Sequence, residues 1–186
     1  KITFFGQSVN YVVEVAVPDL APAYELAQVG LRAEAAAMHE EWLRTRPDDY
    51  SIGIRSELEG GLLIPAVRYI ESQRLRAPIL AEFCAQVFDK IDVLHAPVTD
   101  GPTPRMDDFN PDNPERSAGI MRAQARITRP IGYMGLCALA VPCGFATNGL
   151  PVGFQLIGRP YGEARLFNLG HLYQRETDWH EMAPDL

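Results

Sequence analysis

Residues 135–160 read GLCALAVPCGFATNGLPVGFQLIGRP, a stretch that predicts a β-hairpin. Two apolar runs, each the length of a strand, are separated by a short polar segment. That segment holds Asn148-Gly149, and both of these residue types tolerate the positive φ of a type I′ turn. We therefore expect residues 138–143 to pair with residues 152–158 across a tight turn.

Outward from the hairpin, the chain alternates helical and strand patterns. Apolar side chains between Ala21 and Arg44 recur close to every 3.6 residues, which predicts a long helix with a narrow apolar stripe. Pro65 suits the first turn of another helix, in which Pro78 predicts a break or kink. The expected elements are strands at 11–17, 91–97, 138–142 and 151–158, and helices at 21–44, 50–59, 65–90, 117–127 and 163–174, with a long loop at 98–116.

The composition predicts a globular protein. The 186 residues are 47% hydrophobic and carry a net charge of -7, with no basic tract, so we expect a single domain over residues 1–186 and no nucleic-acid partner. No apolar run approaches the roughly 18 residues that span a bilayer, and we expect no membrane association. The first six residues are too short an apolar stretch for a signal peptide, and the start at Lys1 instead of Met suggests that preceding residues were removed.

Three cysteines, Cys84, Cys137 and Cys143, are an odd number and are widely spaced. Such spacing does not match a zinc site, so we expect reduced thiols in a cytoplasmic protein that binds no metal.

The hairpin stretch closely resembles the C-terminal hallmark of the amidase signature family, which includes amidases and the A subunit of glutamyl-tRNA(Gln) amidotransferase. Further landmarks of that family appear in the same order along the chain from about Val12 onward. These are Ala33-Glu34-Ala35, Tyr50 with Arg55 and Gly60, Tyr69 to Arg76, Asp92-Val93-Leu94 with Ala96-Pro97, Glu163 with the helix after it, and Thr177-Asp178-Trp179-His180.

The resemblance implies an α/β fold, namely a partial mixed sheet with flanking helices that corresponds to the C-terminal half of the amidase-signature fold. It also implies hydrolysis or transfer at an amide C–N bond, with no cofactor. The family's catalytic set is a nucleophilic serine, a second serine and a lysine. The serines here are never adjacent, and the lysines are only Lys1 and Lys90, so we assign no catalytic residue to this chain. The serines are Ser8, Ser51, Ser56, Ser72 and Ser117.

By the same resemblance, Glu34, Arg55 and Thr99 are candidate substrate-binding residues for a small-molecule amide. A surface salt bridge is the alternative role for Glu34 and Arg55. The chain departs from the family pattern at Gly132, where the family usually has Asn, and at Cys137, where it usually has Pro. The Gly132 departure removes a hydrogen-bonding side chain from the expected loop before the hairpin.

Other chemistry finds less support in the sequence. His39-Glu40-Glu41 lacks the second histidine of a HExxH zinc motif, because position 43 is Leu43. Cys143 with a distant histidine has the residue types of a thiol nucleophile, but a small buried residue at a strand end is the alternative.

Two further patterns have structural alternatives. The acidic residues of the long loop, including Asp107 and Asp108, do not follow the spacing of an EF-hand. The glycines at 149, 153 and 158 do not follow the strand-to-helix order of a dinucleotide site, and we expect them to mark bulges or close backbone contacts.

The expected partners follow from the partial fold. A half-sheet exposes an unpaired edge and apolar side chains, so we expect a homo-oligomer or association with an N-terminal half. The alternative function is a non-catalytic module that associates with itself or with a partner.

Overall fold

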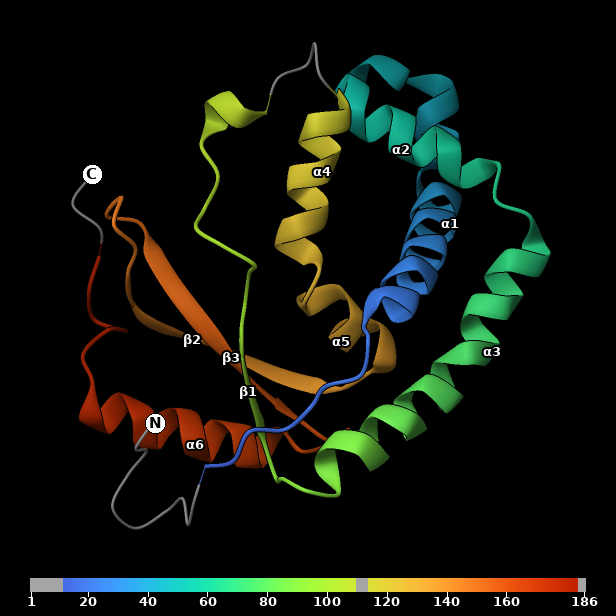
Figure 1. The fold of residues 1–186 in the computed structure, drawn as a ribbon. Coiled ribbons are helices and arrows are strands. Elements are labelled where there is room, and N and C mark those ends of the chain that lie inside the picture. Colours follow the sequence, from blue (N-terminus) through green and yellow to red (C-terminus); the bar gives the residue numbers. More distant parts are fainter. Residues whose placement is uncertain (1–11, 110–113, 184–186) are drawn as a thin grey trace. The chain divides into compact units, whose positions relative to one another are not determined.

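The computed structural model describes residues 12–109 and 114–183 and divides into two compact units (Figure 1). We call them the hairpin unit and the helical unit. The hairpin unit comprises Lys1–Asp19, Leu80–Thr103 and Gly135–Leu186, and the helical unit comprises Leu20–Ile79 and Pro104–Met134. The prediction of a single domain is not tested by this division.

The hairpin unit contains a three-stranded sheet in the order β1-β3-β2. Strand β2 (Cys137–Phe145) pairs with β3 (Pro151–Gly158), and β3 pairs with β1 (Leu94–Pro97). The pairing confirms the predicted hairpin, for example through Val141 opposite Phe154. All three described strands pair antiparallel, whereas a mixed sheet was expected from the family resemblance.

The hairpin turn differs from the predicted type I′ turn. Only Gly149 has a positive φ, at 79°, and Asn148 does not. The Gly149 amide donates to the Ala146 carbonyl at 2.9 Å, and the Ala146 amide donates to the Leu150 carbonyl at 2.8 Å. These bonds enclose a three-residue loop in which the last residue adopts the left-handed conformation, a common alternative to the two-residue turn.

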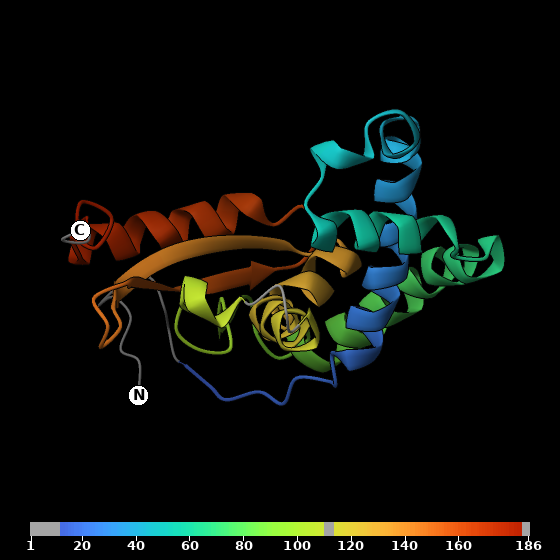
Figure 2. The ribbon, with the colours of Figure 1, turned by 90° about the horizontal axis from the view of Figure 1, so that it is seen from above.

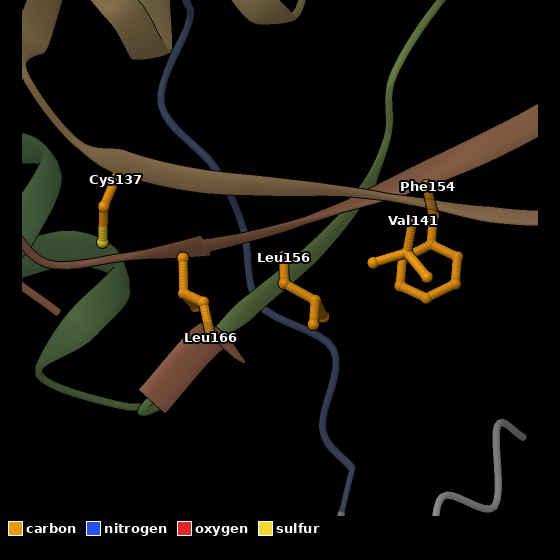
Figure 3. Packing of buried hydrophobic residues seen from close by; sticks show 5 residues of the cluster. All are labelled: Cys137, Val141, Phe154, Leu156 and Leu166. Atoms are coloured by element: carbon orange, nitrogen blue, oxygen red, sulfur yellow. The ribbon is translucent and has the colours of Figure 1, made fainter. Parts of the chain in front are cut away.

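The core of the hairpin unit lies between the sheet and helix α6 (Glu163–Glu176), which runs alongside the hairpin in Figure 2. Figure 3 shows five buried side chains of this core, which come from β2, β3 and α6: Cys137, Val141, Phe154, Leu156 and Leu166. A Cβ atom on Gly170 of α6 would lie 2.6 Å from the Leu139 side chain, so the helix and strand approach closely only because this residue is glycine.

Most helices of the helical unit lie wholly within it. They are α1 (Ala21–Thr45), α2 (Ile52–Leu62), α4 (Pro114–Ala125) and α5 (Thr128–Met134), with short 3-10 turns at Pro47–Asp49 and Met106–Asp108. Helix α3 (Ala66–Phe83) begins in this unit, continues through Pro78, and passes into a π-helical turn at Cys84–Phe88 of the hairpin unit. Among the described residues, no helix has the length and apolar character to cross a membrane.

Gly61 brings α2 against α1. A Cβ atom at this position would lie 2.3 Å from the Arg32 carbonyl oxygen, so no other residue fits without displacing a helix. The helix was expected over residues 50–59, whereas α2 begins at Ile52 and continues to Leu62.

Two further predictions are corrected. The strand expected at 11–17 does not form over residues 12–17, and residue 11 lies outside the described residues. Branched side chains favour a strand only where a neighbouring strand offers its backbone, and Val12 and Val13 are exposed.

Helix α5 was not predicted, because Pro130 and Gly132 resemble loop residues. Pro130 lies in the first turn of this helix, where a proline is tolerated.

Candidate functional site

A cleft of about 400 Å³ opens in the helical unit, among helices α1, α3, α4 and α5. All of its lining residues belong to this unit. They are Ala27, Gly30, Leu31, Glu34, Arg76, Ala125, Thr128, Arg129, Gly132 and Tyr133. The cleft therefore combines an apolar wall with a few polar and charged groups, as small-molecule sites do.

Small residues give the cleft its width. On α1, Ala27, Gly30, Leu31 and Glu34 follow the i, i+3, i+4, i+7 spacing that places side chains on one helix face. Helix α5 contributes Gly132 to the cleft lining, and a Cβ atom added to Gly132 would meet nothing within 4 Å. Gly132 therefore lies in a helix at the cleft wall, and the expected loop before the hairpin is wrong at this position.

Arg129 is held in place by neutral partners on α1. Its guanidinium donates to the Gln28 side-chain oxygen at 2.6 Å and to the Tyr24 hydroxyl at 3.0 Å, and it lies 5.2 Å from the centre of the Tyr24 ring. Because neither partner is an anion, the positive charge of Arg129 is not cancelled by these contacts.

Arg76 places a second positive charge at the cleft. Its guanidinium lies 5.3 Å from the centre of the Tyr133 ring, a cation–π contact. The Tyr133 hydroxyl donates a hydrogen bond to the Ser72 carbonyl, and burial raises the pKa of that hydroxyl. Within the described part of the chain, Arg76 forms no ion pair, so most of its five N–H donors are available to a ligand.

Glu34 supplies the acidic group of the cleft. Its carboxylate accepts a hydrogen bond from the Tyr69 hydroxyl at 2.9 Å, and this bond raises the pKa of Tyr69. A carboxylate has room for about four hydrogen bonds, so Glu34 can still accept from an amide N–H of a ligand.

The structure brings only one of the three predicted binding residues into this cleft. Arg55 lies on α2 and forms exposed ion pairs with Glu59 at 2.6 Å and Asp48 at 3.9 Å, the surface salt bridge considered as its alternative role. Thr99 follows β1 in the hairpin unit, where its hydroxyl donates to the Gly101 carbonyl at 2.8 Å. Their binding roles stay predictions.

The remaining polar motifs have structural partners. The Nδ1 atom of His39 lies 2.8 Å from the Tyr50 hydroxyl oxygen, and the His39 ring contacts the Trp42 ring edge-on. Asp108 accepts from the Arg105 amide at 3.0 Å, in the short 3-10 turn, and pairs with Arg116 at 2.9 Å. In the part of the chain that the structure describes, no three His, Cys, Asp or Glu residues gather in a group that could hold a metal ion.

Cys143 lies at a bulge in β2, between Pro142 and Gly144, and packs against the core of the hairpin unit. Burial raises the pKa of its thiol, whereas a nucleophilic cysteine needs a lowered pKa. Among the serines, Ser72 is buried in α3 and its hydroxyl donates to the Tyr69 carbonyl at 2.7 Å. Neither residue has the environment of an activated nucleophile.

Sequence reasoning did not find Arg76, Arg129 or Tyr133 as cleft residues. The spacing of Arg129 and Tyr133 (i, i+4) signals a shared helix face, but only once residues 128–134 are known to be helical. For Arg76, nothing in the pattern of α3 distinguishes it from Arg74, and both residues are exposed.

Comparisons with known proteins give a consistent result. The Amidase family profile matches residues 12–167. The chain is 36% identical over 168 residues to the A subunit of the glutamyl-tRNA(Gln) amidotransferase of Chloroflexus aggregans, a match that covers 88% of this chain and 33% of the relative. It is 32% identical over 176 residues to an amidase of Pseudomonas putida, a match that covers 94% of this chain and 37% of the relative.

A solved structure shows the same fold. It belongs to a vestigial protein complex connected with the origins of an s-triazine catabolic enzyme, and it matches with a TM-score of 0.72 and 25% identity over 86% of this chain and 35% of that one. The chain spans about a third of the length of the curated relatives it matches. Because the family profile matches most of its residues, the chain belongs to the amidase family.

Proposed function

We propose that this chain forms a substrate-binding portion of an amidase, an enzyme that hydrolyses or transfers the acyl group at an amide C–N bond. In this proposal, the nucleophilic serine and the basic lysine come from residues outside these 186 positions. The lysine takes the serine proton as the serine oxygen attacks the amide carbonyl, and it gives that proton to the leaving amine. Water or an amine acceptor then releases the acyl group from the serine.

The observation that carries the proposal is the composition of the cleft in the helical unit. Glu34 offers a hydrogen-bond acceptor and Arg76 offers donors, and small residues such as Gly30 and Gly132 leave space between them. An amide presents both a donor N–H and an acceptor carbonyl, so a cleft with both kinds of group can orient it. The hairpin unit, with its apolar core, would serve as the scaffold.

A binding measurement tests this role. We expect the purified chain to bind a small neutral amide such as succinamide, detected by heat of binding or by shifts of backbone amide resonances. Substitution of Glu34 by Gln should weaken binding, because an uncharged oxygen is a poorer acceptor than a carboxylate. Glu40→Gln, on the same helix but outside the cleft, is the matched control. Equal weakening by both substitutions would contradict a role for Glu34.

A second measurement concerns catalysis. We expect the purified chain to release p-nitroaniline from p-nitroacetanilide no faster than buffer does, because an unassisted serine hydroxyl is a poor nucleophile near neutral pH. Turnover that copurifies with the chain, and that is lost when one of its own serines is replaced, would show that the chain carries its own catalytic set.

The exposed apolar residues of α2, of Leu63 directly after it and of α3 favour association as a second property. Ile52 and Leu63 are 88% and 82% exposed, and Val67 and Ile70 continue the same apolar character along α3. We propose that this surface is covered by a second copy of the chain or by the remaining part of an amidase domain. Light scattering at micromolar concentration separates the two, since a mass near 20.7 kDa would exclude self-association.

The cysteines bear on where the protein acts, and the reaction bears on whether it needs a cofactor. The three free cysteines support a cytoplasmic protein with reduced thiols. We also propose that no cofactor takes part, since the acyl transfer described above needs only a nucleophile and a base.

A further inference from the structure

The hydrogen-bonding groups around the cleft are mostly donors. Arg76 has N–H groups without an ion-pair partner among the described residues, and Thr128, whose hydroxyl can donate a hydrogen bond, also lines the cleft. Glu34, the acidic lining residue, already accepts from Tyr69. A ligand that matches this set has to bring more acceptors than donors.

The charge of the cleft points the same way. Its lining includes two arginines and one glutamate, whereas the chain as a whole carries a net charge of -7. The partners of Arg129 are the neutral groups of Gln28 and Tyr24, so its positive charge is not neutralised. A positively charged cleft in an acidic protein attracts an anion locally, against the field of the whole molecule.

A buried donor beside the cleft adds an independent observation. The side-chain nitrogen of Gln73, on α3, is buried and makes no hydrogen bond. It lies 3.6 Å from the position that a Cβ atom on Gly30 would take, and Gly30 lines the cleft. Buried amide nitrogens without a partner are rare and costly, and an oxygen of a ligand that reaches past Gly30 would satisfy this one.

We propose that this cleft selects amides whose acyl part carries a carboxylate, and that Arg76 is the residue that determines the preference. The inference rests on the proposed function, because it concerns the same cleft. The carboxylate would accept charge-assisted hydrogen bonds from the Arg76 guanidinium, whose planar fork matches the two carboxylate oxygens. Gln73 would supply an additional donor at the α1–α3 side of the cleft.

Three probe ligands of similar size test the proposal on the purified chain. Succinamate has one amide and one carboxylate, succinamide has two amides, and succinate has two carboxylates. We expect succinamate to bind about tenfold more tightly than succinamide at low salt, the gain of one charge-assisted contact. The difference should shrink as salt is added, because exposed charges are screened.

Substitutions identify the residue responsible. Arg76→Gln should remove the preference for succinamate over succinamide, and Arg76→Lys should keep part of it, because lysine retains the charge without the planar fork. Arg74→Gln, two residues away on the same helix and outside the cleft, should leave the preference intact. Circular dichroism and a melting curve verify that each variant is folded.

Gln73→Met gives a second test that does not depend on Arg76. Replacing an unpaired buried donor by an apolar side chain of similar shape should leave stability unchanged or raise it, while succinamate binding weakens severalfold. A purely structural role for Gln73 would instead lower the stability and leave the affinity of the folded chain unaltered.

The outcomes separate this inference from the proposed function. Equal binding of succinamide and succinamate would overturn the carboxylate preference and leave amide binding in place. Binding of succinate and succinamate with equal affinity, and no binding of succinamide, would support the carboxylate site but contradict amide recognition. Absence of binding by all three would contradict both.

Discussion

The two units of the molecule satisfy their polar groups in different ways. In the hairpin unit, the buried Gln155 side chain donates to the Pro97 carbonyl at 2.9 Å, and the Cys137 thiol donates to the Arg159 carbonyl at 3.0 Å. In the helical unit, the Gln73 side-chain nitrogen is buried without a partner, and Arg76 forms no ion pair among the described residues. The difference fits our proposal that the hairpin unit supports stability and that the helical unit binds the ligand.

The largest effect is expected from the core of the hairpin unit. Phe154 is 6% exposed and packs against Leu156 and the Tyr173 ring, whose centre lies 5.1 Å away. Phe154→Ala should lower the free energy of unfolding by about 3–5 kcal/mol. Phe167→Ala is the matched control, because Phe167 lies on α6 but is 62% exposed; its effect should stay within about 0.5 kcal/mol. Urea denaturation measures both, and equal losses would argue against a distinct core in this unit.

The contact between α1 and α2 predicts the next largest effect. Gly61→Ala should cost about 1–3 kcal/mol, because the new methyl group would meet the Arg32 carbonyl and the Ala36 side chain. Gly60→Ala, one residue earlier on the same helix, meets nothing within 4 Å and should raise stability by about 0.5–1 kcal/mol. If both variants were stabilised in thermal unfolding, the close approach of the two helices would be wrong.

The hairpin turn should show a smaller effect. Gly149→Ala should cost about 1–2 kcal/mol, because alanine resists a φ of 79°. Asn148→Ala should cost about 0.5–1.5 kcal/mol, since it loses one hydrogen bond, from the Leu150 amide to the Asn148 side chain. A larger loss for Asn148 than for Gly149 would favour the type I′ turn that the sequence suggested.

The hairpin unit was more predictable from the sequence than the helical unit, for physical reasons. Strand alternation and the Asn148-Gly149 segment are local signals, and they located the pairing of β2 with β3 correctly. The turn type depended on one φ angle, which the dipeptide alone does not determine. The strand expected near Val12 failed because strand formation needs a partner, which no local pattern supplies.

The cleft was predictable only in part, because it depends on contacts between distant segments. The hydrogen bonds that connect Arg129 to Tyr24 and Gln28 span 105 and 101 positions along the chain. Glu34 was proposed from the family resemblance, and Arg55 from the same resemblance lies in surface ion pairs instead of the cleft lining. A family pattern indicates which helices carry a site, but it does not identify which of their side chains line it.

The most direct test of a binding cleft in the helical unit is a ¹H–¹⁵N correlation spectrum of the labelled chain, titrated with succinamate. We predict that the shifts concentrate on cleft residues of the helical unit, such as Gly30, Glu34 and Gly132, while the amides of Val141 and Gln155 in the hairpin unit stay unchanged. Shifts that concentrate in the hairpin unit instead would contradict the assignment of binding to the helical unit.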